Sequence, residues 1–270
     1  AVHSSVRLAA LVRTELLLAG LSADAREAVN AAVFSAEDTY APGGPTFAQG
    51  LFAWERAALA TAPFPASGRV LLGGAGGGRE LAGLSALGYE VTAFEPAPAL
   101  ADALAAVASR HPGSRAVCAS YADLVRAARG DGGPLAAIVG APFDAVVLGW
   151  ASLSHLTDPA ARAALLAALP AVAPGAPVLL SYLGPDDDGR ANGRVERLRS
   201  PLRRGLALAL GRAAPAPGVG FQPGAGIYQR FSAGEIEALA AAAGYEAVLH
   251  EREPYPHAIL APRSGVTTTR

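Results

Sequence analysis

The chain has 270 residues, 51% of them hydrophobic and 17% charged, with a net charge of -1, so it can bury a substantial core as one α/β unit with attachments. It lacks a basic tract that would clamp a phosphate backbone, which disfavours a nucleic-acid substrate. A single cysteine excludes an intrachain disulfide, no histidine–cysteine cluster has metal-ligand spacing, and no apolar run is long enough to cross a bilayer. We therefore expect a cytoplasmic protein without a metal site.

The first sixty residues are expected to be helical. Ser4 to Ala19 has apolar residues at helical spacing, which suits an amphipathic helix better than a signal peptide. Ser22 caps a second helix, and Pro45 opens a third that runs through Glu55. The apolar face of these helices could pair with a second subunit in a homodimer.

Small residues then separate a short apolar strand from a helix. Gly74, Gly76 and Gly78 follow the spacing G-x-G-x-G. The dinucleotide pattern G-x-G-x-x-G would need a glycine where Arg79 stands. Strands at 69–73, 89–95 and 115–119 alternate with helices at 78–88 and 97–110, which predicts a parallel sheet with helices on both faces. We expect Cys118 to be buried in its strand, which disfavours a thiol nucleophile.

The second half continues the alternation and carries one insertion. Four further segments follow: residues 143–150, which contain Phe143-Asp144-Ala145-Val146, residues 159–169, residues 172–181, which contain Pro174-Gly175, and residues 231–248. The insertion, residues 184–230, contains three aspartates at 186–188, a helical piece at 194–210 and a flexible proline- and glycine-rich stretch at 215–224. Its arginines fit a carboxylate or phosphate site or, as the favoured interpretation, a solvated helix face; they are Arg194, Arg197, Arg199, Arg203 and Arg204.

In this order the segments of residues 69–260 resemble the class I S-adenosylmethionine-dependent methyltransferases. By this resemblance, residues 143–150 are the fourth strand with its F-D-x-V pattern, 159–169 a helix, 172–181 the Pro-Gly turn into the fifth strand, and 231–248 the last helix and sixth strand. The resemblance implies a doubly wound, mostly parallel, seven-stranded Rossmann-like α/β sheet whose last strand is antiparallel. Residues 63–270 would form this domain, residues 1–62 would cover the site, and residues 184–230 would cap the substrate.

The implied activity is direct in-line transfer of a methyl group from S-adenosylmethionine to a small-molecule acceptor, at oxygen before nitrogen. A methyltransferase acting on a peptide or RNA, and a non-catalytic nucleoside-binding protein that kept the fold, stay open as alternatives. A nicotinamide-dependent oxidoreductase is disfavoured by Arg79 and by the Pro174-Gly175 turn.

The cofactor is expected at the carboxyl ends of the strands, where Glu95 would accept hydrogen bonds from the ribose hydroxyls. The family's acid for the adenine amino group falls at Ser120 or is displaced to Asp123, and its acid before the glycines is replaced by Leu72. These departures imply weaker cofactor binding or compensation from the N-terminal helices. The residues expected to bind the cofactor are Gly73, Gly74, Ala75, Gly76, Gly78, Glu95, Pro96, Ser120, Tyr121, Trp150 and Ala151.

The loop after the fourth strand holds the candidate general base, His155, for which a purely local hydrogen-bonding role is an equally favoured alternative. Aromatic and basic side chains of the N-terminal helices and of the segments around the insertion are candidates for substrate contact. They are Tyr40, Phe47, Tyr182, Tyr228 and Arg230, and the first two could instead anchor helices to the core.

Overall fold

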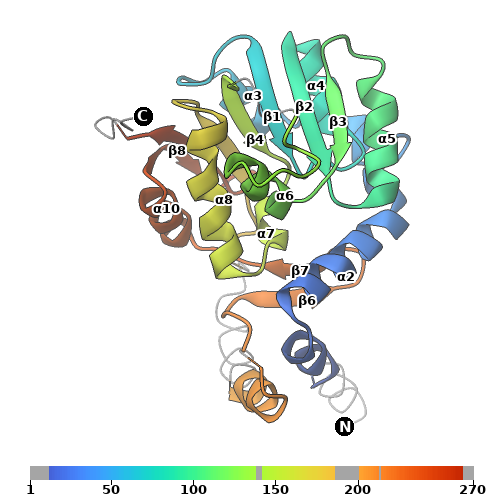
Figure 1. Ribbon diagram of the computed structural model, residues 1–270, viewed down its shortest axis with the longest axis vertical. Helices are drawn as coiled ribbons and strands as arrows, with labels where there is room; N and C mark the ends of the chain where they lie inside the picture. Colours follow the sequence, from blue (N-terminus) through green and yellow to red (C-terminus); the bar gives the residue numbers. More distant parts are fainter. Residues whose placement is uncertain (1–11, 138–141, 186–200, 213, 264–270) are drawn as a thin grey trace.

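The computed structural model describes residues 12–137, 142–185, 201–212 and 214–263. A seven-stranded sheet forms its centre, in the order β3-β2-β1-β4-β5-β9-β8 (Figure 1). All neighbours from β3 to β5 are parallel, whereas β9 is antiparallel to both β5 and β8. The prediction of a mostly parallel seven-stranded sheet with an antiparallel last strand is confirmed. The strands are β1 Gly68–Gly73, β2 Tyr89–Glu95, β3 Arg115–Cys118, β4 Ala145–Leu148, β5 Val178–Ser181, β8 Tyr245–Glu251 and β9 His257–Pro262.

Helices cover both faces of the sheet, because its central strands are apolar on both sides. Val70 and Leu72 of β1 face one core cluster, and Leu71 between them faces the other. The first cluster is completed by α3 Ala53–Leu59, α4 Arg79–Ala86 and α5 Pro98–Ala108. The second is completed by α6 Tyr121–Ala128, α8 Pro159–Val172 and α10 Ala233–Ala242. Leu72 is fully buried, so an acid at this position would lose its hydration in an apolar core.

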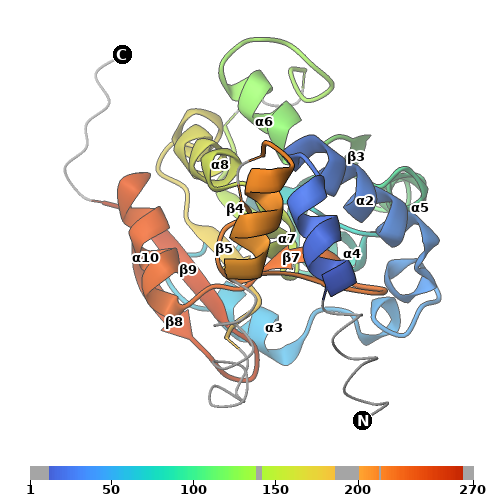
Figure 2. The ribbon, with the colours of Figure 1, turned by 90° about the horizontal axis from the view of Figure 1, so that it is seen from below.

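A layer of elements from both ends of the sequence lies over the carboxyl ends of the parallel strands (Figures 1 and 2). We call it the covering layer. It consists of helical residues 12–20, α2 Ala23–Ala36, helical residues 201–209, and the hairpin of β6 Val219–Gln222 and β7 Gly226–Gln229. Leu18, Val219 and Ile227 form its small apolar core. Arg203 and Glu15, both buried, join helical residues 201–209 to helical residues 12–20, with the Arg203 Nε 2.5 Å from a Glu15 carboxylate oxygen.

Two predictions about the insertion are wrong. Residues 215–224 are not a stretch without regular structure, because Val219–Gln222 form β6, which pairs with β7 and packs in the covering layer. Arg203 is not on a solvated helix face, since it is 4% exposed and paired with Glu15. Arg204, the next residue, is exposed as expected. The three aspartates at 186–188 and Arg194, Arg197 and Arg199 lie outside the described residues, as do residues 4–11 of the first expected helix.

Two further predictions fail for local reasons. The expected helix from Pro45 through Glu55 is broken, because Gly50 has a φ of 61° between a 3₁₀ turn at Phe47–Gln49 and the start of α3. Cys118 is exposed instead of buried, since β3 is the edge strand of the sheet. No helix within the described ranges is long and apolar enough to span a membrane.

Candidate active site

The loop between β1 and α4 brings the chain close to the ends of β2 and β4. Gly74, Gly76 and Gly78 have φ values of 64°, 53° and 98°, which glycine adopts without strain. A Cβ at Gly74 would lie 2.5 Å from the Cβ of Ser152. The Gly149 amide donates to the Gly73 carbonyl at 2.8 Å. Any side chain at position 74 would therefore push the loop away from the start of α7 Ser152–His155.

The carboxylate of Glu95 ends β2 and is 6% exposed. One oxygen accepts from the Gly76 amide and the other from the Ala97 amide, each at 2.9 Å. Each oxygen keeps a lone pair for a further donor. Burial raises the pKa of this carboxyl to about 7, and the two amide hydrogen bonds offset the effect only in part.

The ends of β3 and β4 supply further walls. The hydroxyl of Tyr121 lies 2.6 Å from that of Ser152, and its ring meets Phe94 edge to face. Ala151 has a φ of 55°, and its amide donates to the Ser181 hydroxyl at 2.9 Å. The Trp150 amide donates to a carboxylate oxygen of Glu80, in α4, at 3.0 Å. These contacts fix the loop after β4 against its neighbours.

His155 is held by the covering layer. Its Nδ1 lies 3.1 Å from the carbonyl oxygen of Ile227 in β7. Because a carbonyl only accepts, Nδ1 carries the proton and Nε2 of the neutral ring keeps a free lone pair. Burial lowers the pKa of the imidazole, against the opposing effect of the Ile227 hydrogen bond. The Phe34 ring of α2 packs edge to face at 4.9 Å.

Asn30 ties α2 to β7 in a way that the sequence did not reveal. Its side chain accepts from the Ile227 amide at 2.6 Å and donates to the Ile227 carbonyl at 2.8 Å. A longer bond of 3.4 Å reaches the carbonyl of His155. The side chain is 6% exposed, so α2 is fixed over the site by satisfied buried polar groups.

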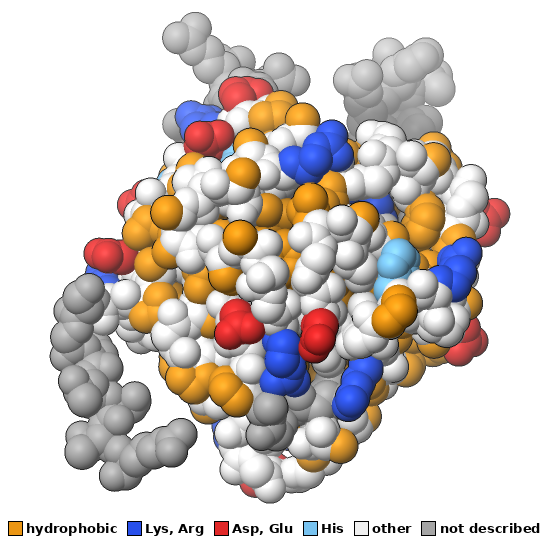
Figure 3. Space-filling model, turned by 90° about the horizontal axis from the view of Figure 1, so that it is seen from above, with side chains coloured by type: hydrophobic (Ala, Val, Ile, Leu, Met, Phe, Trp, Pro, Cys, Tyr) orange, Lys and Arg blue, Asp and Glu red, His pale blue; other side chains and the backbone are white. Residues whose placement is uncertain are grey.

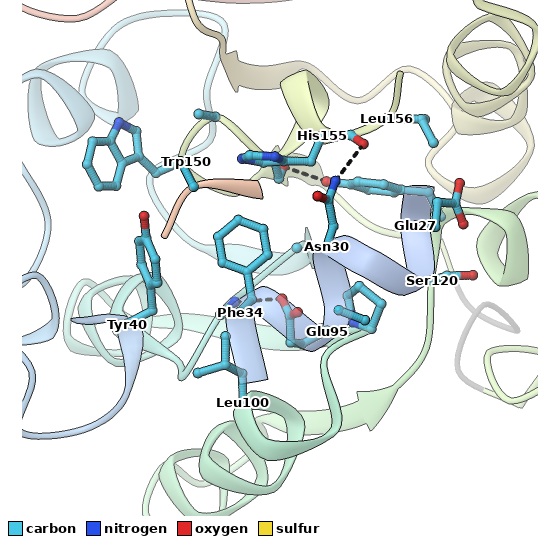
Figure 4. A pocket seen from close by; sticks show the side chains of 18 of the residues that line it. Glu27, Asn30, Phe34, Tyr40, Glu95, Leu100, Ser120, Trp150, His155 and Leu156 are labelled. Atoms are coloured by element: carbon cyan, nitrogen blue, oxygen red, sulfur yellow. Dashed lines mark hydrogen bonds between the residues drawn. The ribbon is translucent and has the colours of Figure 1, made fainter. Parts of the chain in front are cut away.

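Together these elements enclose a cavity of about 390 Å³, within the range of small-molecule sites (Figure 4). Glycine-loop, strand-end and α2 residues line it, and Tyr40, Trp150 and Tyr255 form an aromatic wall. The predicted residues that line it are Tyr40, Gly74, Gly76, Glu95, Pro96, Ser120, Tyr121, Trp150, Ala151 and His155. Residues of the lining that sequence reasoning missed include Glu27, Asn30, Phe34, Leu100, Leu183, Ala225 and Tyr255.

The remaining predicted site residues lie outside the cavity lining. Gly73, Ala75 and Gly78 shape the glycine loop from behind. Phe47 packs against the core cluster of α3–α5. Tyr182 is 1% exposed and pairs through its hydroxyl with His250 at 2.6 Å. Tyr228 and Arg230 stack on each other, and Arg230 also donates to the Gly184 carbonyl at 2.9 Å.

A buried charge network supports the loops behind the cavity. Arg79, at the start of α4, binds both oxygens of Glu55 at 2.6 and 2.7 Å and one oxygen of Glu80 at 2.7 Å. The same Glu80 oxygen accepts from the Trp150 amide at 3.0 Å. The guanidinium also lies 4.0 Å above the ring of Phe52. Arg79 thus connects α3, the glycine-loop helix and the loop after β4.

Residues 47–250 match the profile of the family described as a methyltransferase domain. The chain belongs to this methyltransferase family. It is an S-adenosylmethionine-dependent methyltransferase, and the cavity fits the cofactor: Glu95 offers two oriented acceptors for a diol, beside a glycine loop that a Cβ would obstruct. No match was found among curated protein sequences.

Solved methyltransferase structures share the fold. The Burkholderia thailandensis 1,6-didemethyltoxoflavin-N1-methyltransferase is 20% identical, with 87% of this chain and 89% of that chain covered and a TM-score of 0.55. CcbJ from Streptomyces caelestis is 18% identical over 84% and 96% of the two chains, with a TM-score of 0.55. A Methanosarcina mazei methyltransferase is 18% identical over 79% and 98%, with a TM-score of 0.52.

Proposed function

We propose that this methyltransferase acts on a small aromatic molecule, with a hydroxyl oxygen as the first choice of acceptor atom and a nitrogen as the second. The observation that carries the proposal is the composition of the cavity. Its walls combine Glu95 and the glycine loop with Phe34, Tyr40 and Tyr255, and flat apolar surfaces bind a flat apolar ligand.

In this proposal the cofactor lies along the carboxyl ends of the strands, with its ribose at Glu95. The cofactor supplies an electrophilic methyl group, and the acceptor atom bonds to that carbon as the carbon–sulfur bond breaks. The protein aligns the two reactants, which removes much of the entropic barrier. The residues proposed to contact the cofactor are Gly74, Gly76, Glu95, Pro96, Ser120, Tyr121, Trp150 and Ala151, with Gly73, Ala75 and Gly78 shaping the loop.

His155 is the proposed general base, which takes the acceptor's proton on Nε2. The Ile227 carbonyl holds the tautomer that this role needs. A pKa lowered by burial makes the ring a weak base, so an acidic hydroxyl such as a phenol suits it better than an aliphatic alcohol. A weak base at this position therefore favours a hydroxyl oxygen over a nitrogen as the acceptor atom.

A small acceptor is also favoured over a peptide or RNA. Residues of the covering layer, Asn30, Phe34 and Ala225, close part of the cavity wall. On the end of the molecule away from the covering layer, the described arginines and acidic side chains are interspersed and do not form a broad positive area that would suit RNA (Figure 3). Among proteins of this fold, the Burkholderia thailandensis enzyme was crystallised with 1,6-didemethyltoxoflavin, a small molecule.

The test is a screen of acceptors with S-adenosylmethionine carrying a labelled methyl group. Phenols, aromatic amines, a peptide library and total RNA are incubated separately, and the label is followed into product. We expect turnover with phenols, less with aromatic amines, and none with peptide or RNA. Labelling of RNA or peptide would contradict the proposal, and so would the absence of turnover with every phenol and aromatic amine.

A further inference from the structure

The carboxylate of Glu27 is a charge in the cavity wall without a counter-charge. It lies on α2, is partly buried and lines the cavity. The hydrogen bonds and ion pairs of the described residues include none to Glu27. Burial raises the pKa of this carboxyl, and the charges of Asp24, Asp158 and Asp123 raise it further. A ligand that donates a hydrogen bond would stabilise it.

The position of Glu27 in the cavity limits which group of a bound cofactor can reach its carboxylate. The negative charge of Asp123, at the start of α6, contributes to the raised pKa of Glu27. Glu27 and Ser120 lie at one end of the cavity (Figure 4). In the sheet order, β3 lies beyond β2, on the side away from β4. A cofactor with its ribose at Glu95 and its methyl group beside the loop after β4 extends its base toward β3 and α6.

The polar residues next to Glu27 at this end of the cavity, Ser120 and Asp123, already hydrogen-bond to each other. One oxygen of Asp123 accepts from both the amide and the hydroxyl of Ser120 at 2.8 Å, and the other is paired with Arg126 at 2.5 Å. The Ser120 hydroxyl accepts in turn from the Asp123 amide at 3.2 Å. This capping box completes the first turn of α6. Asp123 does not line the cavity, so Glu27 is the lining carboxylate at this end, within the described part of the chain.

We propose that Glu27 accepts a hydrogen bond from the exocyclic amino group of the cofactor's adenine. The inference rests on the proposed placement of the cofactor with its ribose at Glu95. It assigns base recognition to the covering layer, so that the helix that closes the cavity also reads the cofactor.

The test compares S-adenosylhomocysteine with S-inosylhomocysteine, in which a carbonyl oxygen replaces the adenine amino group and the neighbouring N1 carries a proton. Against a carboxylate, this oxygen offers an acceptor in place of a donor. Calorimetry on the wild type should show about tenfold to hundredfold weaker binding of the inosine analogue. In Glu27→Ala the two ligands should bind within about threefold of each other. Glu27→Gln, which keeps the shape and can donate through its amide, should also lose most of the discrimination.

Asp123→Asn is the matched variant at the rival carboxylate, and it should keep the wild-type ratio. Loss of discrimination in Asp123→Asn but not in Glu27→Ala would overturn the inference. So would an unchanged ratio in both Glu27 variants, or a changed acceptor KM with an unchanged ratio, which would place an acceptor amine at Glu27. If the wild type binds neither ligand, the proposed cofactor placement itself fails. Because the measured quantity is the ratio of two affinities for the same variant, a reduced fraction of folded protein affects both affinities equally and leaves the ratio unchanged.

Discussion

The carboxylate of Glu95 is the residue on which the proposed cofactor placement depends most. Glu95→Ala removes both acceptors of the ribose diol and frees the Gly76 and Ala97 amides. We expect binding of S-adenosylhomocysteine to weaken by about 1–3 kcal/mol, measured by calorimetry. Glu90→Gln, at an exposed position of the same strand, is the control and should leave the affinity unchanged. Equal affinity in Glu95→Ala would place the cofactor elsewhere.

The same residue predicts how cofactor binding depends on pH. The pKa of Glu95 is raised to about 7 by burial, and donors from the ribose would stabilise the charged form and lower it. Protons therefore compete with the ligand below pH 7. We expect the affinity to be level above about pH 8 and to fall by up to about tenfold per pH unit below 7. Titrations between pH 5.5 and 8.5 check this, and the slope should vanish in Glu95→Gln.

His155 gives a prediction on rate. His155→Asn removes the free Nε2 lone pair and keeps an amide at the position of Nδ1 that can donate to the Ile227 carbonyl. With an acceptor found in the screen, kcat should fall about 10²–10⁴-fold, and affinity for S-adenosylhomocysteine should stay within about threefold. His111→Asn, in the turn after α5, should match the wild type. A kcat close to wild type in His155→Asn would leave His155 the role of linking α7 to β7.

The sequence predicts the cavity residues that lie at strand ends, but not those that reach the cavity because a helix packs over it. Glu95 and Gly74 lie in the cavity because the last residue of a parallel strand, or the one after it, lies at the carboxyl end of the sheet. Glu27, Asn30 and Phe34 lie there only because α2 packs over β7. No local pattern marks them, since helical periodicity does not say which helix face meets a cavity.

At the scale of elements, Arg79 holds α3, α4 and the loop after β4 together. Arg79→Leu would leave Glu55 and Glu80 buried without their counter-charge, at side-chain exposures of 5% and 7%. We expect the free energy of unfolding to fall by about 3–5 kcal/mol in urea denaturation.

Arg126→Leu serves as the comparison for Arg79→Leu, because it breaks an ion pair with Asp123 in which the Arg126 side chain is 54% exposed. It should cost less than about 1 kcal/mol. Adding Glu55→Leu to Arg79→Leu should recover part of the loss, because one stranded charge is removed. Similar costs for the Arg79 and Arg126 single variants would mean that water solvates the buried network.

The predicted elements succeeded where burial is continuous and failed where the chain turns. β1 and β2 are apolar on both faces, so their limits were visible from the sequence. The hairpin β6–β7 was hidden because Gly218, Gly224 and Gly226 lie in or beside it, and all three have positive φ. Glycines and prolines indicate turns, but they do not tell whether the turns are packed against the rest of the fold.

At the scale of the whole molecule, the site has two halves of different construction. The strand ends belong to a sheet that is buried on both faces. The covering layer has a small apolar core and depends on buried polar contacts, among them Arg203 with Glu15 and Asn30 with Ile227. A layer with few apolar contacts is expected to open more readily than the sheet. Such opening would give ligands access to the cavity.

This difference predicts where one substitution acts. In Arg203→Leu the carboxylate of Glu15 loses its bidentate partner in a buried position, and the carbonyl of Val219 loses a donor at 3.0 Å. Hydrogen exchange of amides in α2 and β7 should accelerate by at least about a hundredfold, while amides of β1 and β4 keep their protection. Arg204→Leu, at the exposed neighbouring position, should change neither. Saturating S-adenosylhomocysteine should slow exchange in α2 again, because the ligand binds only where α2 closes the cavity. Equal loss of protection in the sheet and the covering layer would show that the molecule opens as a single cooperative unit, and ligand access would then require global unfolding or another path.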